Sequence, residues 1–72
     1  MIDKKYAYHK PSSRGLEAIT RLREAYSTLQ RTIEEVCPPS RQCALAITEL
    51  EMSAMWAIKS VVFNDSESEV EQ

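Results

Sequence analysis

Two tyrosines, a histidine and a lysine gather in the short segment YAYHK, Tyr6 to Lys10, close to the start of the chain. Aromatic faces stack on nucleobases, worth roughly 1–3 kcal/mol per base, and a cationic side chain beside them suits a phosphate. The two tyrosines could equally hold this segment against the rest of the protein, and composition alone favours that structural role. The segment therefore offers nucleotide-binding chemistry without establishing it.

Arginines are the second kind of candidate, because a planar guanidinium can hold a phosphate through two hydrogen bonds. Arg21 and Arg23 fall where a first helix is predicted, and a solvated charge beside a neighbouring glutamate is the simpler interpretation of each. Arg41 falls in the first turn of a predicted second helix, where free backbone N–H groups favour an anion. Thr48 could donate its hydroxyl to a ligand or bond to carbonyls of its own helix.

Groups for catalysis or metal binding are sparse. His9 is the single histidine, no serine or cysteine has a base at a recognisable spacing, and no carboxylates cluster on an apolar face. Cys37 and Cys43 have no second ligand pair, so zinc is not favoured, and Cys43 is better explained as a small buried thiol than as a reactive one. We therefore expect no enzymatic activity, no metal and no cofactor.

Two helices must position these candidates. Beyond Pro11, Ser12 and Ser13 supply N-cap oxygens, and apolar residues at steps of three and four then predict a helix that ends at CPP, where prolines stop it. Ser40 can cap a second helix after a connection of about four residues, which forces an antiparallel hairpin. The apolar stripe of the first helix consists of Leu16, Ile19, Leu22, Tyr26, Leu29, Ile33 and Val36.

The second helix is apolar on two faces, and a single neighbouring helix covers only one. The first stripe consists of Ala44, Ile47, Leu50, Ala54, Ile58 and Val61, and the second stripe consists of Leu45, Thr48, Met52, Met55 and Val62. A chain of 72 residues has a marginal core, so self-association is the expected source of stability. We expect another copy to cover the second stripe, with Trp56 in the oligomer core or, alternatively, stacked on a base.

Charge is distributed unevenly along the chain. Residues 1–41 hold eight Lys or Arg against five Asp or Glu, whereas residues 42–72 hold one against six, for a net charge of −2. An acidic chain repels polyphosphate, so DNA and RNA polymers are not expected partners. The absence of a secretory or membrane signal predicts a soluble, intracellular protein that does not bind a membrane.

The predicted fold class is all-α, and it has three parts. An extended N-terminal arm covers residues 1–11, an antiparallel two-helix hairpin covers residues 12–63, and an acidic tail covers residues 64–72. The tail is predicted to be disordered, because it has little apolar surface and its carboxylates follow a helix C-terminus. The hairpins are expected to assemble into a homo-oligomeric helical bundle.

Several motifs together resemble the hairpin domain of phage anti-CBASS and anti-Thoeris sponge proteins. They are an arm ending in YHKPS, an arginine in the middle of the first helix, the turn CPPSR, and a second helix with ALAITELE followed by AMWA. The resemblance runs from Tyr6 to Val62. It implies a helical subunit that forms a hexamer and sequesters cyclic nucleotide messengers of bacterial immunity, without degrading them, in the cytoplasm of the infected host.

The resemblance also implies roles for individual residues. By position, Tyr8 would stack on a base of the ligand, His9 would assist it, and Arg23 would hold a phosphate. Arg41 and Thr48 would belong to a second pocket, which takes cyclic trinucleotides. The expected ligands are cyclic dinucleotides, with cyclic trinucleotides and glycocyclic ADP-ribose as further members of the class.

Three positions depart from the family pattern. Lysine often stands at the position of Glu49, asparagine at that of Ile58, and lysine at that of Ser27. The loss of two cations would narrow the range of ligands, triply charged rings in particular.

A helical adaptor or inhibitor is the alternative function, in which the second stripe binds a host protein as a helix in a groove. A plain structural oligomer is a third possibility, because it also requires an apolar second stripe. Only the sponge requires YAYHK and Arg23 for binding a small anionic ligand while assembly does not depend on them.

Overall fold

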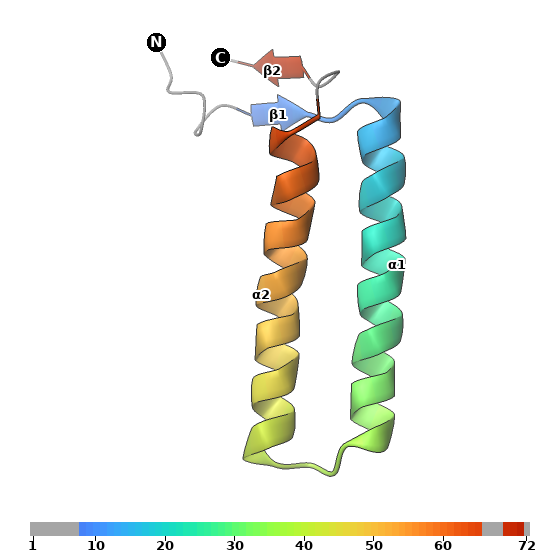
Figure 1. Cartoon of the computed structure of the whole chain (residues 1–72), viewed down its shortest axis with the longest axis vertical. Helices are drawn as coiled ribbons and strands as arrows, with labels where there is room; N and C mark the ends of the chain where they lie inside the picture. The colour runs from blue at the N-terminus through green and yellow to red at the C-terminus, as the bar shows by residue number, and fades with distance from the viewer. Residues whose placement is uncertain (1–7, 66–68, 72) are drawn as a thin grey trace.

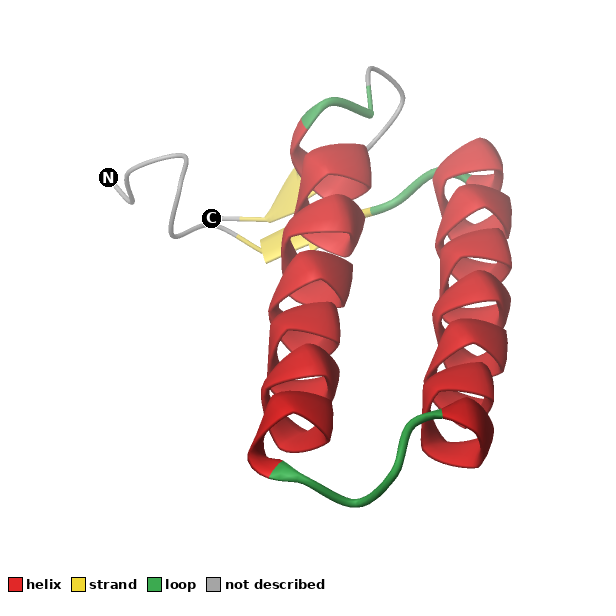
Figure 2. Cartoon of the chain, turned by 60° about the horizontal axis from the view of Figure 1, so that its bottom comes forward, coloured by secondary structure: helices red, strands yellow, loops and turns green. Residues whose placement is uncertain are grey.

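A computed structural model describes residues 8–65 and 69–71 of the chain (Figure 1). Its elements in chain order are β1 (Tyr8–Lys10), α1 (Ser13–Val36), α2 (Arg41–Phe63) and β2 (Glu69–Glu71). The two helices lie side by side, joined by a short turn at one end, and the two strands pair beside the other end (Figure 2). The predicted hairpin of two helices is confirmed, and a two-stranded sheet of three residues per strand is added to it.

Both helices begin at the serines that the sequence indicates. The Ser12 side chain accepts a hydrogen bond from the backbone N–H of Gly15 at 3.1 Å, and Ser40 does the same for Cys43 at 3.0 Å. Each contact satisfies one of the amide groups that a helix start leaves unpaired. Between the helices, the two prolines of the turn end α1 because they have no N–H to donate. The predicted turn and caps are confirmed.

The hairpin is a single layer of two helices, and the chain as a whole has extents of 48 × 24 × 12 Å. Its thickness is that of one helix with its side chains, about 10–12 Å, so both broad faces of the layer are open. As a result, Gly15 and Ile19 are the only buried residues of α1, and no residue of α2 is buried. No helix in the described part of the chain is long and apolar enough to cross a membrane.

The seam between the helices has the spacing of a coiled coil. Its buried and half-buried positions recur at steps of three and four on both helices, as expected when side chains interlock across a narrow contact. These positions are Gly15, Ile19, Leu22, Tyr26, Gln30, Ile33 and Cys37 on one side, and Cys43, Ile47, Leu50, Ala54, Ala57, Ile58 and Val61 on the other. Both cysteines have free thiols.

Four residues of the two stripes that were predicted to face each other, the stripe of α1 and the first stripe of α2, lie outside this seam. Leu16, Leu29 and Val36 are 55%, 47% and 73% exposed, respectively, and Ala44 of α2 is also exposed. A contact between two helices admits about two positions in seven, and a wider stripe extends beyond it. Part of each predicted stripe is therefore uncovered in the single chain.

A hydrogen bond crosses the seam near the middle of the hairpin. The hydroxyl of Tyr26 on α1 lies 2.6 Å from the hydroxyl of Ser53 on α2. Tyr26 thus packs its ring in the apolar seam, and its hydroxyl makes a hydrogen bond to the neighbouring helix, as a half-buried tyrosine usually does. Sequence periodicity indicated the ring's placement and gave no sign of the bond.

Asp65, just beyond α2, ties the open end of the hairpin together. Its carboxylate accepts hydrogen bonds from the backbone N–H of Ser12 at 2.9 Å and from the Ser12 hydroxyl at 2.8 Å. A carboxylate beside a helix start is favoured by the partial positive charge there, and bonds to a charged acceptor are the stronger kind. A side chain at Gly15 would clash with this carboxylate and press against Pro11, which explains a glycine in the first turn of α1.

Part of the acidic tail, which the sequence predicts to be disordered, forms the strand β2. β2 pairs antiparallel with β1, with Tyr8 opposite Glu71, His9 opposite Val70, and Lys10 opposite Glu69. Residues 1–7, 66–68 and 72 lie outside the described residues. A single strand such as β1 offers its backbone N–H and C=O groups to a second strand, and composition alone does not reveal which segment pairs with it. The division into arm, hairpin and tail stays a prediction.

The contact between Gly15 and Asp65 makes a prediction about stability. Gly15→Ala is expected to lower the free energy of unfolding by about 1–2 kcal/mol, because the new methyl group displaces the carboxylate from Ser12. In an Asp65→Ala background the same change is expected to be neutral or stabilising, by up to about 1 kcal/mol, since alanine is the better helix former. Urea denaturation followed by circular dichroism, at one protein concentration, measures all four proteins. Additive effects would contradict this network.

Candidate ligand-binding site

A groove on one face of the layer contains Arg23, and we call it the Arg23 groove. Both helices contribute to it along one flank, at steps of three and four residues. It is lined by Arg23, Tyr26, Ser27 and Gln30 of α1 and by Leu50, Glu51, Ala54 and Ile58 of α2. The α2 side is aliphatic apart from the carboxylate of Glu51, while arginine, serine and glutamine line the side of α1. This combination suits a flat apolar group with an anionic substituent.

The guanidinium of Arg23 is available to such an anion. Arg23 is exposed, and among residues 11–65 no side chain or backbone group makes an ion pair or hydrogen bond with it. An exposed guanidinium without an ion pair fits both interpretations made from the sequence, a solvated charge and a clamp for a phosphate. A bidentate contact with a phosphate would use donors that the chain leaves open.

The size of the Arg23 groove limits what one chain can hold. Its volume is about 270 Å³, whereas pockets for small molecules usually enclose about 300–1,000 Å³ and surround most of the ligand. The groove is also a depression on an open face of a layer that is 12 Å thick. A nucleotide ring bound there would keep much of its surface in water unless a second surface covered it.

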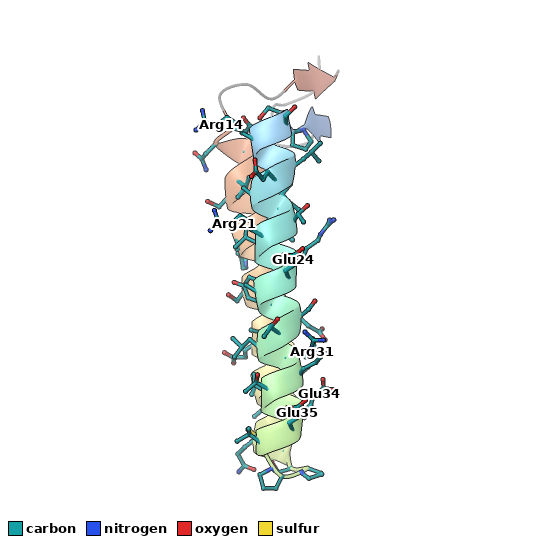
Figure 3. The ribbon with its side chains drawn as sticks, turned by 90° about the vertical axis from the view of Figure 1, so that its right-hand side faces the viewer. Arg14, Arg21, Glu24, Arg31, Glu34 and Glu35 are labelled. Carbon is teal, nitrogen blue, oxygen red and sulfur yellow. The ribbon has the colours of Figure 1, made fainter. Side chains whose placement is uncertain are left out.

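Arg21 lies on the other broad face. Two residues along an α-helix correspond to a rotation of about 200°, so Arg21 and Arg23 point to opposite sides of the layer. Arg21 borders a hollow of about 410 Å³ with Ala18, Leu22, Ala25 and Val61. In Figure 3, Arg14 and Arg21 extend from one flank of α1, and Glu24 and Arg31 from the other. The two candidate arginines cannot bind the same phosphate within one chain.

Tyr8 and His9 lie on β1, at the open end of the hairpin and beside the end of α2 (Figure 1). Arg23 is ten residues beyond the start of α1 at Ser13, which is about 15 Å along the helix axis. The structure therefore places these three candidates on one half of the molecule, at different levels. A ligand that contacts all of them has to span the interval or bridge two copies of the chain.

Arg41 and Thr48 occupy the half of the molecule that contains the turn. Arg41 is the first residue of α2, and Thr48 lies seven residues later on the same face; both are exposed. Leu45 and Met52, which are 43% and 51% exposed, lie on this face as well. Arg41 and Thr48 thus border the second stripe, far from Tyr8 and His9, and the structure does not bring the two sets of candidates together.

The second stripe has no cover within the chain. Met55 is 51% exposed, like Met52, and only Val62 among the five residues is half-buried. Trp56, at the edge of the stripe, is 59% exposed, and the Lys59 ammonium lies 5.4 Å from the centre of its ring. A large exposed aromatic next to two exposed methionines is typical of a surface that binds something.

Sequence reasoning missed the contribution of α2 to the Arg23 groove. Glu51, Ala54 and Ile58 line it at helical steps of three and four. The steps were visible in the sequence, but Ala54 and Ile58 were counted only as packing residues. Which polar residue stands across from Arg23 depends on how the two helices are aligned, and the periodicity of either helix alone does not fix this alignment.

Comparison with known proteins gives one match. The family model described as Acb2/Tad1, hairpin domain, matches residues 1–62, which confirms the resemblance found from the motifs. No curated protein and no solved structure matches the chain. The matched residues include both helices except the last residue of α2, together with Tyr8, His9, Arg23, Arg41 and Thr48. The chain therefore belongs to the Acb2/Tad1 hairpin family, a family of cyclic-nucleotide-binding anti-defence proteins that act as binding domains rather than enzymes.

Proposed function

We propose that this protein is a phage sponge that sequesters cyclic oligonucleotide immune messengers, without cleaving them, in the cytoplasm of the infected bacterium. The family match over residues 1–62 carries the proposal. The exposed guanidinium of Arg23 beside the aliphatic side chains of α2 supports it, since a nucleotide ring presents both phosphates and flat bases. Cyclic dinucleotides are the primary ligands, and cyclic trinucleotides and glycocyclic ADP-ribose are further members of the class.

In this proposal, copies of the chain associate and cover the apolar surface that a single chain leaves exposed. A layer that is 12 Å thick and has a single buried hydrophobic residue, Ile19, among those described leaves most of its apolar surface in water. Covering the second stripe with another copy removes Leu45, Met52, Met55 and Trp56 from water, at roughly 25 cal/mol per Å² of apolar surface. Six copies make the assembly in this proposal, as the family resemblance implies.

A site shared between two copies would enclose a ligand that is too large for the groove of one chain. A cyclic dinucleotide has two nearly equivalent halves, so two copies related by a two-fold axis can offer each half the same residues. In such a site Arg23 holds a phosphate, Tyr8 stacks on a base, and His9 supports the stacked base. Because both surfaces are fixed by packing, less order has to be gained when the ligand binds.

Arg41 and Thr48 form the second, separate site in this proposal. They border the second stripe, so a neighbouring copy that covers the stripe also lies next to them. Arg41 adds its charge to the free N–H groups at the start of α2, a combination that attracts phosphate. A three-fold arrangement of copies would present three such sets to a cyclic trinucleotide.

Ligand retention tests the proposed function directly. Native mass spectrometry of the purified protein with cyclic di- and trinucleotides is expected to show intact ring held by an oligomer at a whole-number ratio. Arg23→Ala is expected to weaken cyclic dinucleotide binding by about 10- to 150-fold, the cost of one hydrogen bond to a charged group. Tyr8→Ala is expected to weaken it by about 5- to 150-fold through lost stacking.

Arg31→Ala is the matched control, because Arg31 is another exposed arginine on α1 that lies outside the Arg23 groove. The control is expected to retain the ring, and all three variants are expected to keep the oligomer. An oligomer that retains no ring from the panel would overturn the sponge. In that case the second stripe favours the alternative, an adaptor or inhibitor of a host protein.

The second stripe makes its own prediction about assembly. Met52→Glu places a charge in the stripe and is expected to shift the protein from oligomer to smaller species in sedimentation velocity, because an unpaired buried charge is costly. Ala46→Glu is the control, since Ala46 is an exposed position of the same helix that lies away from the stripe. Equal assembly of the two variants would show that the copies meet elsewhere.

A further inference from the structure

A row of six side chains runs along the outer edge of α2, on the side that faces away from α1. Its members recur at alternating steps of four and three residues, which keeps them in line along one side of a helix. They lie about half a turn around the helix from the residues of the seam. We call them the edge row, and they are Leu45, Glu49, Met52, Trp56, Lys59 and Phe63. Phe63 is half-buried and the other five are exposed, so the single chain leaves this row uncovered.

The chemical character of the edge row is symmetric about its centre. Taken from the two ends inward, the residues form the pairs Leu45 with Phe63, Glu49 with Lys59, and Met52 with Trp56. The outer and inner pairs combine an apolar side chain with an aromatic one, and the middle pair combines opposite charges. All three pairs share one midpoint in the sequence, Ala54. A two-fold axis at the level of Ala54 would therefore bring the members of each pair opposite each other on two copies of α2.

Such a contact requires the two copies of α2 to run antiparallel. Each of the three pairs is then formed twice, because a two-fold contact uses the same surface of both copies. Glu49 of each copy meets Lys59 of the other, between two apolar contacts. The sulfur of Met52 meets the ring of Trp56, which is a favourable contact for a thioether. Steps of four and three residues are also the spacing at which two helices interlock along a seam.

Other arrangements of the same two helices lose the match of charges. A parallel pair in register would place Glu49 opposite Glu49 and Lys59 opposite Lys59. An antiparallel pair shifted by one helical turn would place Lys59 opposite Leu45 or Met52, according to the direction of the shift. A charged residue within an apolar seam selects one register, and like charges in contact exclude the competing ones. The edge row thus favours a single pairing.

The two charges of the edge row are available for this purpose. Among residues 11–65, no cation forms an ion pair with Glu49 and no carboxylate forms one with Lys59. The Lys59 ammonium lies 5.4 Å from the centre of the Trp56 ring and 5.7 Å from that of the Phe63 ring. Both rings belong to the edge row, so these cation–π contacts hold the ammonium on the row.

We infer that the edge row is a self-complementary contact, through which α2 packs antiparallel against α2 of a second copy about a two-fold axis at Ala54. The inference rests on the proposed function in that copies associate, and it adds their direction and their register. Antiparallel edges are related by an axis perpendicular to the layer, so two hairpins join into one layer of four helices. Both Arg23 grooves then open on the same side of this layer, where a ring and a further copy have access to them.

Cross-linking of the wild-type protein tests the register directly. A carbodiimide joins a lysine amine to a carboxylate only where the two are in contact. Glu49 and Lys59 are ten residues apart on α2, about 15 Å along its axis, so the bond between them cannot form within one chain. Peptide mass spectrometry of the covalent dimer is expected to show the link between Glu49 and Lys59. An assembled protein whose covalent dimers lack this link would overturn the inference.

Exchange of the two charges provides a second test. Glu49→Lys and Lys59→Glu each bring like charges together twice, and each is expected to raise the dissociation constant of assembly by about 10- to 100-fold. Glu49→Lys/Lys59→Glu pairs opposite charges again and is expected to come within about fivefold of the wild type. Sedimentation velocity over a range of protein concentrations measures these constants, and circular dichroism verifies that each variant is helical. A double variant as weak as the single ones would contradict the pairing.

Glu35→Lys is the matched control, since it makes the same change of charge as Glu49→Lys at an exposed position of α1 near the turn (Figure 3). Its assembly is expected to stay within about twofold of the wild type. An equal loss of assembly in this control would overturn the inference, because net charge would then explain the single variants.

Ring retention separates this inference from the proposed function. An assembly that retains cyclic dinucleotide but shows neither the link nor the rescue would overturn the pairing and leave the sponge in place. An assembly that shows both but retains no ring would support the pairing and overturn the sponge. If the wild type neither associates nor retains a ring, both fail.

Discussion

Two helices joined by a short turn can bury a single seam, and this constraint governs the rest of the structure. Each helix offers about two positions in seven to its partner, so a layer 12 Å thick keeps both of its broad faces in contact with solvent. The chain nevertheless carries apolar residues far beyond those positions. Leu16, Leu29 and Val36 on α1 remain exposed, as do Met52, Met55 and Trp56 on α2. This uncovered apolar surface links the fold to the proposed function. Other copies of the chain that pack against it can also enclose a ligand in a shared site.

Local signals made most of the fold predictable from the sequence. Ser12 and Ser40 cap the helices through a bond to an amide three residues later, and the prolines of the turn stop α1. Such contacts depend on neighbours in the chain, so residue type and spacing are sufficient to find them. The seam was predicted in outline, and the exact choice between neighbouring positions such as Ala44 and Cys43 was not, since it depends on how the two helices turn toward each other.

Contacts between distant parts of the chain were not predictable in this way. The carboxylate of Asp65 reaches Ser12 across 53 positions of sequence, and nothing near Asp65 marks it as the partner of a helix start. Gly15 was the one available signal, as a glycine in the first turn of a helix calls for a reason. The pairing of β1 with β2 was hidden for a similar reason, because the charged composition of the tail indicates disorder. For the site, sequence motifs selected Arg23, whereas only the structure identifies the α2 residues that line its groove.

The bond between Tyr26 and Ser53 has a consequence for the alignment of the two helices. A seam made of small and aliphatic side chains tolerates sliding, because one apolar contact resembles the next, whereas a single polar pair fits only one register. Sliding α2 by one turn, about 5.4 Å, would separate the two hydroxyls that now lie 2.6 Å apart. The same movement would carry Leu50, Ala54 and Ile58 away from Arg23. The hydrogen bond between the two hydroxyls thus favours one register of the helices, and this register is the one that brings both sides of the Arg23 groove together.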